Sequence, residues 1–150
     1  MQLTRFTDIG LRVLMYLTQP ERDDPVTISE IADQFDISRN HLVKVVHFMA
    51  QHGWIVTTRG KGGGLALAMQ PCDYRMGQVV RSLEGTTALV NCNEPACGLR
   101  MGCNLRGVLA KALQEFYGFL DQYTLADAVA GRTSELLRDM TDARLIIRAS

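Results

Sequence analysis

The sequence predicts a mainly α fold, a winged helix-turn-helix with a small β-hairpin wing and a long dimerisation helix. Two short amphipathic helical patterns, residues 28–35 and 39–52, are separated by a turn of only a few residues, which is typical of a helix-turn-helix. β-Rich segments on both sides of a glycine run, residues 54–68, follow at once and predict the hairpin. The longest periodic apolar pattern, residues 105–123, predicts a helix of about five turns.

Length and composition describe a globular chain of about one domain. Of the 150 residues, 47% are hydrophobic and 21% are charged. This length and this hydrophobic fraction are sufficient to form a hydrophobic core. The longest apolar runs, residues 13–17 and 65–69, are far shorter than the roughly 18–20 residues that cross a bilayer, which excludes a transmembrane helix. Asp8 and Arg12 interrupt the region where a signal peptide would be apolar. We therefore expect a cytoplasmic protein with no membrane partner.

Charge is unevenly distributed, although 16 basic residues balance 16 acidic ones. Residues 21–36 are strongly acidic, whereas residues 37–72 contain no acid, several bases and all three histidines. A phosphate backbone attracts a segment of the second kind. A chance charge-poor stretch on a neutral protein is the alternative, and charge alone does not separate the two.

Capping signals place the starts of the first three helices. Thr7 is the candidate N-cap of a helix over residues 8–18. Thr27 and Glu30 form a T-x-x-E capping box at the start of the second helix. Ser38 is the candidate N-cap of the third, which is the recognition helix of the predicted helix-turn-helix.

The recognition helix and the wing carry the candidate contacts to double-stranded DNA. Because the apolar residues of the third helix point inward, the polar residues of its first two turns face a major groove. Basic side chains that flank the glycine run would contact the DNA backbone or the minor groove. That run lacks the G-K-[ST] ending of a nucleotide-binding P-loop, which argues against the alternative of a phosphate cradle. The predicted DNA contacts are Ser38, Arg39, Asn40, His41 and Lys44 on the helix, and Arg59 and Lys61 on the wing.

The second half of the chain contains the predicted dimerisation helix. The apolar stripe along residues 105–123 is wide enough to need a partner, and a two-fold mate would supply one. Covering the core of its own domain is the alternative explanation for part of the stripe. Shorter helices are predicted over residues 76–83, 124–130 and 134–148. The chain thus divides into a winged-helix DNA-binding region (1–85), a cysteine loop (86–104), a dimerisation helix region (105–130) and a C-terminal segment (131–150), within a single domain overall.

Three of the four cysteines fall in the loop, where Cys92, Cys97 and Cys103 follow the spacing C-x4-C-x5-C. Structural zinc sites typically use closer C-x2-C pairs. An iron–sulfur cluster suits this spacing better, because its separate irons each take a thiolate of their own. Three thiols without metal on an open loop would oxidise readily. Cys72, either a fourth ligand or a plain buried thiol, and Glu94 are the local candidates to complete the site.

Two other classes of protein remain open at this point. A cluster carrier or redox enzyme would need a substrate pocket or an electron route, and no Ser-His-Asp, H-E-x-x-H or paired-carboxylate pattern is present. We therefore predict that the protein is not an enzyme. The other class is a zinc- or thiol-based DNA-binding regulator without iron.

Several motifs occur together in order between residue 1 and about residue 129, and together they resemble one family. That family is the bacterial winged-helix iron–sulfur regulators, and the resemblance is to its nitric-oxide-sensitive repressors. The motifs are Phe6-Thr7-Asp8-Ile9-Gly10-Leu11-Arg12, Ser38-Arg39-Asn40-His41-Leu42-Val43-Lys44-Val45, Arg59-Gly60-Lys61-Gly62-Gly63-Gly64, Leu89-Val90-Asn91-Cys92 with Cys97 and Cys103, and Tyr123-Thr124-Leu125-Ala126-Asp127.

The resemblance implies a homodimeric transcriptional repressor whose 2Fe-2S or 4Fe-4S cluster is bound by the three loop cysteines. Nitric oxide is the implied signal, and genes for its detoxification are the implied targets. In the nitric-oxide-sensitive members an aspartate of the first helix, reaching across from the partner subunit, completes the site, and Asp8 is at the matching position. Local sequence alone interprets Asp8 differently, as an acid near a helix N-terminus that interacts favourably with the helix dipole.

Overall fold

A computed structural model describes residues 2–19, 24–60, 62–85 and 88–149 of the chain. It is mainly α-helical with one small antiparallel hairpin, so the predicted fold class is confirmed. Lys61 lies outside the described residues. In chain order the elements are α1 (Arg5–Tyr16), α2 (Ile28–Phe35), α3 (Arg39–Gln51), β1 (Ile55–Thr57), β2 (Leu65–Leu67), the 3₁₀ helix η1 (Pro71–Asp73), α4 (Met76–Glu84), α5 (Asn104–Leu120), α6 (Leu125–Ala128) and α7 (Arg132–Ala149).

Helix α1 begins three residues before the predicted start, because Thr4 and not Thr7 is the N-cap. The Thr4 hydroxyl accepts a hydrogen bond from the backbone N–H of Thr7 at 3.2 Å, and Thr7 itself is completely buried inside the helix. Glu84 at the end of α4 accepts from both the backbone N–H and the hydroxyl of Thr4, at 2.7 and 3.0 Å. The start of α1 therefore depends on a partner 80 residues away, which local capping signals do not report.

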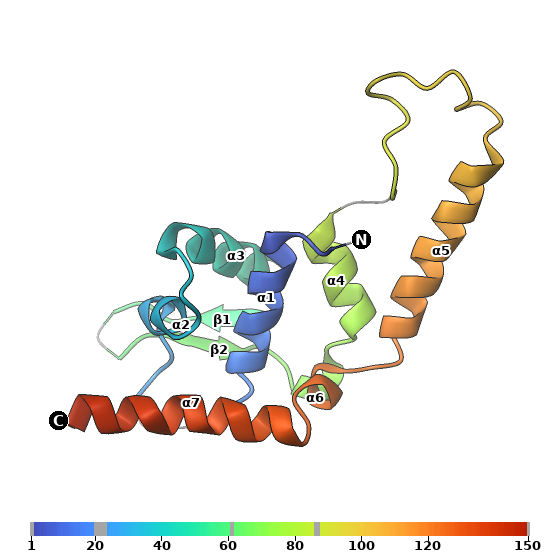
Figure 1. Cartoon of the computed structure of the whole chain (residues 1–150). Helices are drawn as coiled ribbons and strands as arrows, with labels where there is room; N and C mark the ends of the chain where they lie inside the picture. The colour runs from blue at the N-terminus through green and yellow to red at the C-terminus, as the bar shows by residue number, and fades with distance from the viewer. Residues whose placement is uncertain (1, 20–23, 61, 86–87, 150) are drawn as a thin grey trace.

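Helix α1 runs through the centre of the molecule, between the α2–α3 pair and α4 (Figure 1). Its Val13 and Leu14 are completely buried. Tyr16 donates its hydroxyl to the carboxylate of Glu30 in α2 at 2.8 Å, and Glu30 is buried. The predicted capping box is therefore only half formed: the Thr27 hydroxyl accepts from the Glu30 N–H, but the Glu30 side chain turns into the core. Burial next to a tyrosine hydroxyl replaces the capping contact that the sequence predicts.

The hairpin is shorter than predicted, and its turn end contacts the segment before α2. Residues 55–57 pair with residues 65–67, with Val56 opposite Ala66. The turn needs glycine: Gly60 has φ +94°, and a Cβ on Gly63 would clash with the carbonyl oxygen of Thr58. Next to the turn, the Leu65 N–H donates to the carbonyl of Val26 at 2.8 Å. This contact joins the wing to the segment just before α2.

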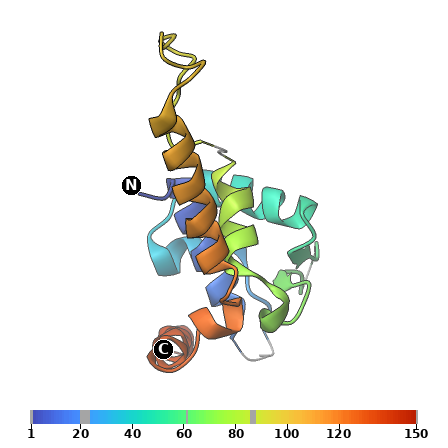
Figure 2. The ribbon, with the colours of Figure 1, turned by 90° about the vertical axis from the view of Figure 1, so that its right-hand side faces the viewer.

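Helix α5 packs on α4 through part of its length and then extends past the body of the protein. Val80, Leu113 and Tyr117 form a small buried cluster between the two helices. The described part of the cysteine loop, residues 88–103, continues from the far end of α5 (Figures 1 and 2). Helix α7 lies across the opposite end of the molecule, and its Leu137 packs into the main core. Among the described residues, no helix has both the length and the apolar composition that crossing a membrane requires.

Candidate functional site

Helix α3 presents a polar face directly opposite its buried one. Its buried residues are Leu42, Val45, Val46 and Met49. With about 3.6 residues per turn, Asn40, Lys44 and His47 lie at the centre of the outward face. Arg39 and Val43 lie on the side of that face nearer the wing, and His41 lies about a quarter turn away on the other side. Every candidate DNA contact on this helix is exposed: Ser38, Arg39, Asn40, His41 and Lys44.

Ser38 is the N-cap of α3 by position only. Its hydroxyl makes no capping hydrogen bond, unlike those of Thr4 and Thr27. The Ser38 side chain is exposed, so its hydroxyl remains available at the end of the helix that faces solvent. A hydroxyl next to free helix N–H groups is suited to contact a phosphate.

A groove of about 440 Å³ runs between α3, the start of α2 and the hairpin. It brings Arg39 and His47 of α3 to the same concave surface as Arg59 of the wing. Hydroxyl groups contribute the rest of its polar lining, from Thr27, Ser29, Thr57 and Thr58. Sequence reasoning did not single out Val43, His47 or these hydroxyls. For Val43 and His47 the available signal was their spacing of four and eight residues from Arg39, which places them in one row along the helix.

An aromatic cluster holds the C-terminal end of α3 in place. The Phe48 ring stacks on the His52 ring at 4.0 Å and meets the edges of Phe6 and Trp54 at 5.3 and 6.1 Å between ring centroids. These contacts join α1, α3 and the start of the hairpin. Because edge-to-face and stacked pairs have preferred geometries, the cluster restricts how α3 can move relative to α1.

Tyr74 anchors the base of the wing. Its hydroxyl donates to the carbonyl of Trp54 at 2.5 Å and accepts from the N–H groups of Ala68 and Met69 at 3.2 Å each. Burial raises the pKa of the Tyr74 hydroxyl above its usual value of 10.0. The neutral phenol is the form that can donate to the Trp54 carbonyl, so protonated Tyr74 keeps the two strand ends together.

The cysteine loop carries three reduced thiols. Cys92 and Cys103 are half-buried, and Cys97 is exposed. The Cys97 N–H donates to the carbonyl of Cys92 at 3.1 Å, and the Asn91 side chain accepts from the N–H groups of residues 93 and 94. Three accessible thiols are soft ligands that fit iron–sulfur chemistry. In the described part of this single chain, however, no three or more side chains of His, Cys, Asp or Glu are grouped closely enough to hold a metal ion.

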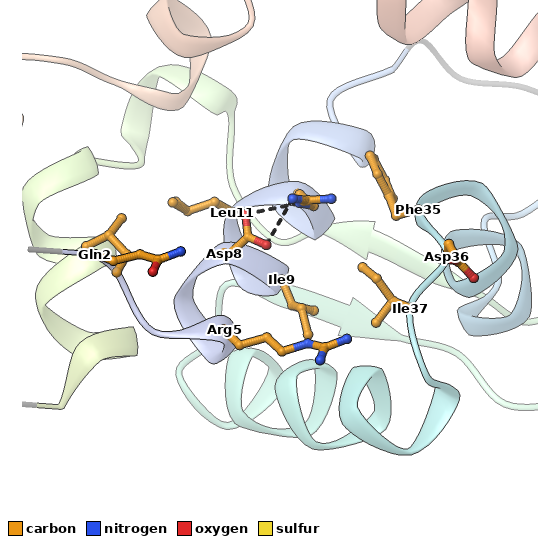
Figure 3. A pocket seen from close by; sticks show the side chains of 10 residues that line it. Gln2, Arg5, Asp8, Ile9, Leu11, Phe35, Asp36 and Ile37 are labelled. Carbon is orange, nitrogen blue, oxygen red and sulfur yellow. Dashed lines mark hydrogen bonds and ion pairs between the residues drawn. The ribbon is translucent and has the colours of Figure 1, made fainter.

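Asp8 lies on α1, and in the described part of this chain no group of three or more metal-binding side chains unites it with the loop cysteines. Its carboxylate accepts from the guanidinium of Arg12 at 3.0 and 3.1 Å. The two residues line a cavity of about 730 Å³ that also reaches Arg5, Phe35 and Ile37 (Figure 3). A site that combined Asp8 with the loop thiols would therefore need two copies of the chain.

The two local candidates to complete the cysteine site differ in position. Cys72 lies on η1 and is exposed, so the interpretation of Cys72 as a plain buried thiol was wrong. Pro71 is the first residue of η1, four residues after the end of β2, and Cys72 directly follows it. Glu94 is exposed within the loop itself.

Helix α5 leaves an apolar surface uncovered. Leu105, Val108 and Phe119 are 64%, 61% and 57% exposed. Within the chain only Leu113 and Tyr117 of this helix are buried. Self-covering therefore explains part of the predicted stripe, because Phe116 and Leu120 also pack against the buried cluster with α4. The apolar side chains that remain exposed are typical of a protein–protein contact.

Comparison with known proteins identifies one family and one fold. The model of the Rrf2 family, described as an iron-dependent transcriptional regulator, matches residues 3–131. The chain resembles CymR, the global cysteine regulator of B. subtilis, at 22% identity over 87% of this chain and 97% of that one, with a TM-score of 0.66. A Listeria innocua protein assigned as a transcriptional regulator matches at 26% identity over 86% of both chains, with a TM-score of 0.68. IscR of T. potens matches at 23% identity over 86% of both chains, with a TM-score of 0.65.

Proposed function

The chain belongs to the Rrf2 family of iron-dependent transcriptional regulators, and we propose that within this family it is a nitric-oxide-sensitive repressor of the NsrR type. The observation that carries the proposal is the loop of three reduced thiols, Cys92, Cys97 and Cys103, at the end of a helix with an uncovered apolar face. In this proposal, residues 1–85 bind DNA, residues 86–104 bind the cluster and residues 105–130 form the dimer. The proposal assigns no role to residues 131–150.

DNA binding uses the outward face of α3 and the wing. Arg39 and Asn40 can make bidentate contacts to base edges, and Lys44 can contact a phosphate. Arg59 and Lys61 add contacts to the DNA backbone or the minor groove, which raise affinity with little sequence information. In a homodimer the two copies of α3 would read half-sites about one helical turn, roughly 34 Å, apart.

Dimerisation uses the apolar face of α5. A second copy of α5 would cover Leu105, Val108 and Phe119, which are exposed in the single chain. The proposed cofactor site requires in addition that the cysteine loop of one subunit lies near the α1 helix of the other. Symmetric readers of DNA half-sites are usually dimers of this kind.

The cofactor site combines the thiolates of Cys92, Cys97 and Cys103 with the carboxylate of Asp8 from the partner subunit. When bound, a 2Fe-2S or 4Fe-4S cluster supplies an iron centre with which nitric oxide reacts. A carboxylate is a hard ligand among soft thiolates, so Asp8 would be the most weakly held of the four ligands. Asp8 also lies on α1, and α1 packs on α3, the proposed recognition helix.

Release of Asp8 would therefore free the cysteine loop from the partner's α1 and remove a constraint on the spacing of the two α3 helices. A coupling of only about 1–3 kcal/mol between the two sites changes operator occupancy roughly 5- to 150-fold. Loss of the constraint would end repression at genes for nitric oxide detoxification.

A metal-free thiol regulator is the second candidate function. Two observations favour it. The described side chains form no metal site within one chain, and Cys72 and Cys97 are exposed. In this case oxidation of the accessible thiols, rather than loss of a ligand to iron, would change DNA binding.

Anaerobic purification and an absorption spectrum separate the two candidates. A nitric-oxide-sensitive cluster protein should show broad visible bands, iron and acid-labile sulfide in each chain, and operator binding that nitric oxide abolishes. Cys97→Ser should remove all three properties, whereas Cys72→Ser, which replaces an exposed cysteine outside the loop, should leave them intact. A colourless protein that binds its operator equally with and without nitric oxide would exclude the proposed function.

A further inference from the structure

Val43 is an apolar side chain on the polar surface of α3, on the side of that surface nearer the wing. It is 48% exposed, and it is the one exposed large apolar side chain among the described residues of α2 and α3. A single exposed valine is common on protein surfaces and needs no explanation by itself. What distinguishes Val43 is its position among the side chains that line the groove beside the wing.

Val43 lies midway along the row of α3 side chains that lines the groove beside the wing. Arg39 precedes it by four residues and His47 follows it by four, so each neighbour is slightly more than one helical turn, about 6 Å, along the axis. All three line the groove of about 440 Å³. Val43 is in the second turn of α3, in the N-terminal half of the helix, and that half of a recognition helix reaches the base edges.

The major groove offers one apolar group to such a side chain. Adenine, guanine and cytosine present hydrogen-bond donors and acceptors there, whereas thymine adds its C5-methyl group. A valine against a donor or acceptor would leave that polar group without a partner, which is unfavourable. Against the thymine methyl it forms an apolar contact instead. Its branched Cβ holds one χ1 rotamer in a helix, so little conformational entropy is lost on binding.

We infer that Val43 is a specificity-determining residue that recognises the C5-methyl group of one thymine in each half-site of the operator. The inference rests on the proposed function, because it requires α3 to enter the major groove. It adds a base preference at one position of the operator. That position is adjacent to the bases contacted by Arg39 and Asn40, which lie within one turn of Val43 on the same helix.

The test replaces thymine by uracil, which removes the methyl group and changes no hydrogen bond. The operator is first selected from random double-stranded DNA with the full-length protein purified anaerobically. Each thymine of one half-site is then replaced singly by uracil, and binding is measured for the parent and for Val43→Ala. Val56→Ala is the matched control, because Val56 is also an exposed valine, at 53%, but lies on β1 and does not line the groove.

We expect uracil at one position to weaken binding by the parent and by Val56→Ala about fourfold, the contribution of one buried methyl-sized group. Val43→Ala should bind the thymine and uracil operators equally at that position. The inference is overturned if the parent distinguishes thymine from uracil nowhere, or if Val43→Ala retains the full preference, and either result leaves the proposed DNA-binding function intact. A parent protein that selects no sequence from the random pool overturns the proposed function and this inference together.

Discussion

Replacing Asp8 by alanine separates the two roles that its carboxylate can have. Asp8 and Arg12 form an ion pair in which both side chains are about half exposed. An exposed pair four residues apart on a helix stabilises it by about 0.3–0.5 kcal/mol, and the interaction with the helix dipole adds about 0.3–1 kcal/mol. The higher helix propensity of alanine offsets part of this loss, by about 0.5 kcal/mol. We therefore expect the free energy of unfolding to fall by less than about 1 kcal/mol, a Tm shift of at most about 2–4 °C.

Cluster stability should change far more than folding stability. The assay follows the loss of visible absorbance after addition of nitric oxide and, separately, the operator affinity of the untreated protein. Arg12→Ala is the matched control, because it breaks the same ion pair and retains the carboxylate. Asp8→Ala should lose the cluster faster than the parent and bind the operator roughly 5- to 150-fold more weakly. Arg12→Ala should resemble the parent in both measurements.

Equal behaviour of the Asp8→Ala and Arg12→Ala proteins would refute this reasoning. Asp8 would then act only as a helix acid paired with Arg12, and the search for a fourth ligand would move to Glu94 or Cys72. A large loss of folding stability in Asp8→Ala alone would contradict the estimate from the exposed ion pair.

Three further predictions concern DNA binding and the base of the wing. Arg39→Ala should weaken operator binding by about 1–3 kcal/mol and relax the preference at one base pair, measured by competition between operator variants; unchanged selectivity would mean that α3 does not face the groove as proposed. Replacing Arg59 and Lys61 together by alanine should lower the slope of log K against log salt by about 2 if both contact phosphate, and an unchanged slope would remove the wing from the interface. Tyr74→Phe should cost about 1–3 kcal/mol at neutral pH, because the three hydrogen bonds of the hydroxyl are lost, although the Ala68 N–H and the Trp54 carbonyl keep the 3.0 Å hydrogen bond between them. Since burial raises the pKa of Tyr74 in the folded state, the stability that its neutral form provides is present below about pH 10 and is lost as the pH rises above that value. Urea denaturation across this range should therefore show that the free energy of unfolding declines with pH in the parent and declines less steeply in Tyr74→Phe. Part of the decline should remain in the variant, because the pKa of buried Tyr117 is also raised.

Features that depend on neighbours within a few residues were predictable from sequence. The T-x-x-E signal placed the start of α2 correctly, because the Thr27 hydroxyl needs only an N–H three residues later. The glycine run identified the turn of the wing, because left-handed backbone at Gly60 excludes most other residues. The apolar spacing of α3 identified its buried face, and therefore the exposure of Arg39, Asn40 and Lys44, because helical periodicity is a property of consecutive residues.

Features that depend on contacts across the chain were decided by the tertiary structure. The start of α1 moved to Thr4 because Glu84, far away in sequence, binds that residue. Glu30 left its expected capping position because the Tyr16 hydroxyl offers it a buried partner. The groove beside α3 unites Arg39 with Arg59 only because the hairpin folds back toward the helix. Likewise, the lack of a metal-binding group that unites Asp8 with the loop cysteines in the described part of the chain follows from how α5 packs on α4 and carries the loop past the body, and residue spacing along a chain contains no information about such packing.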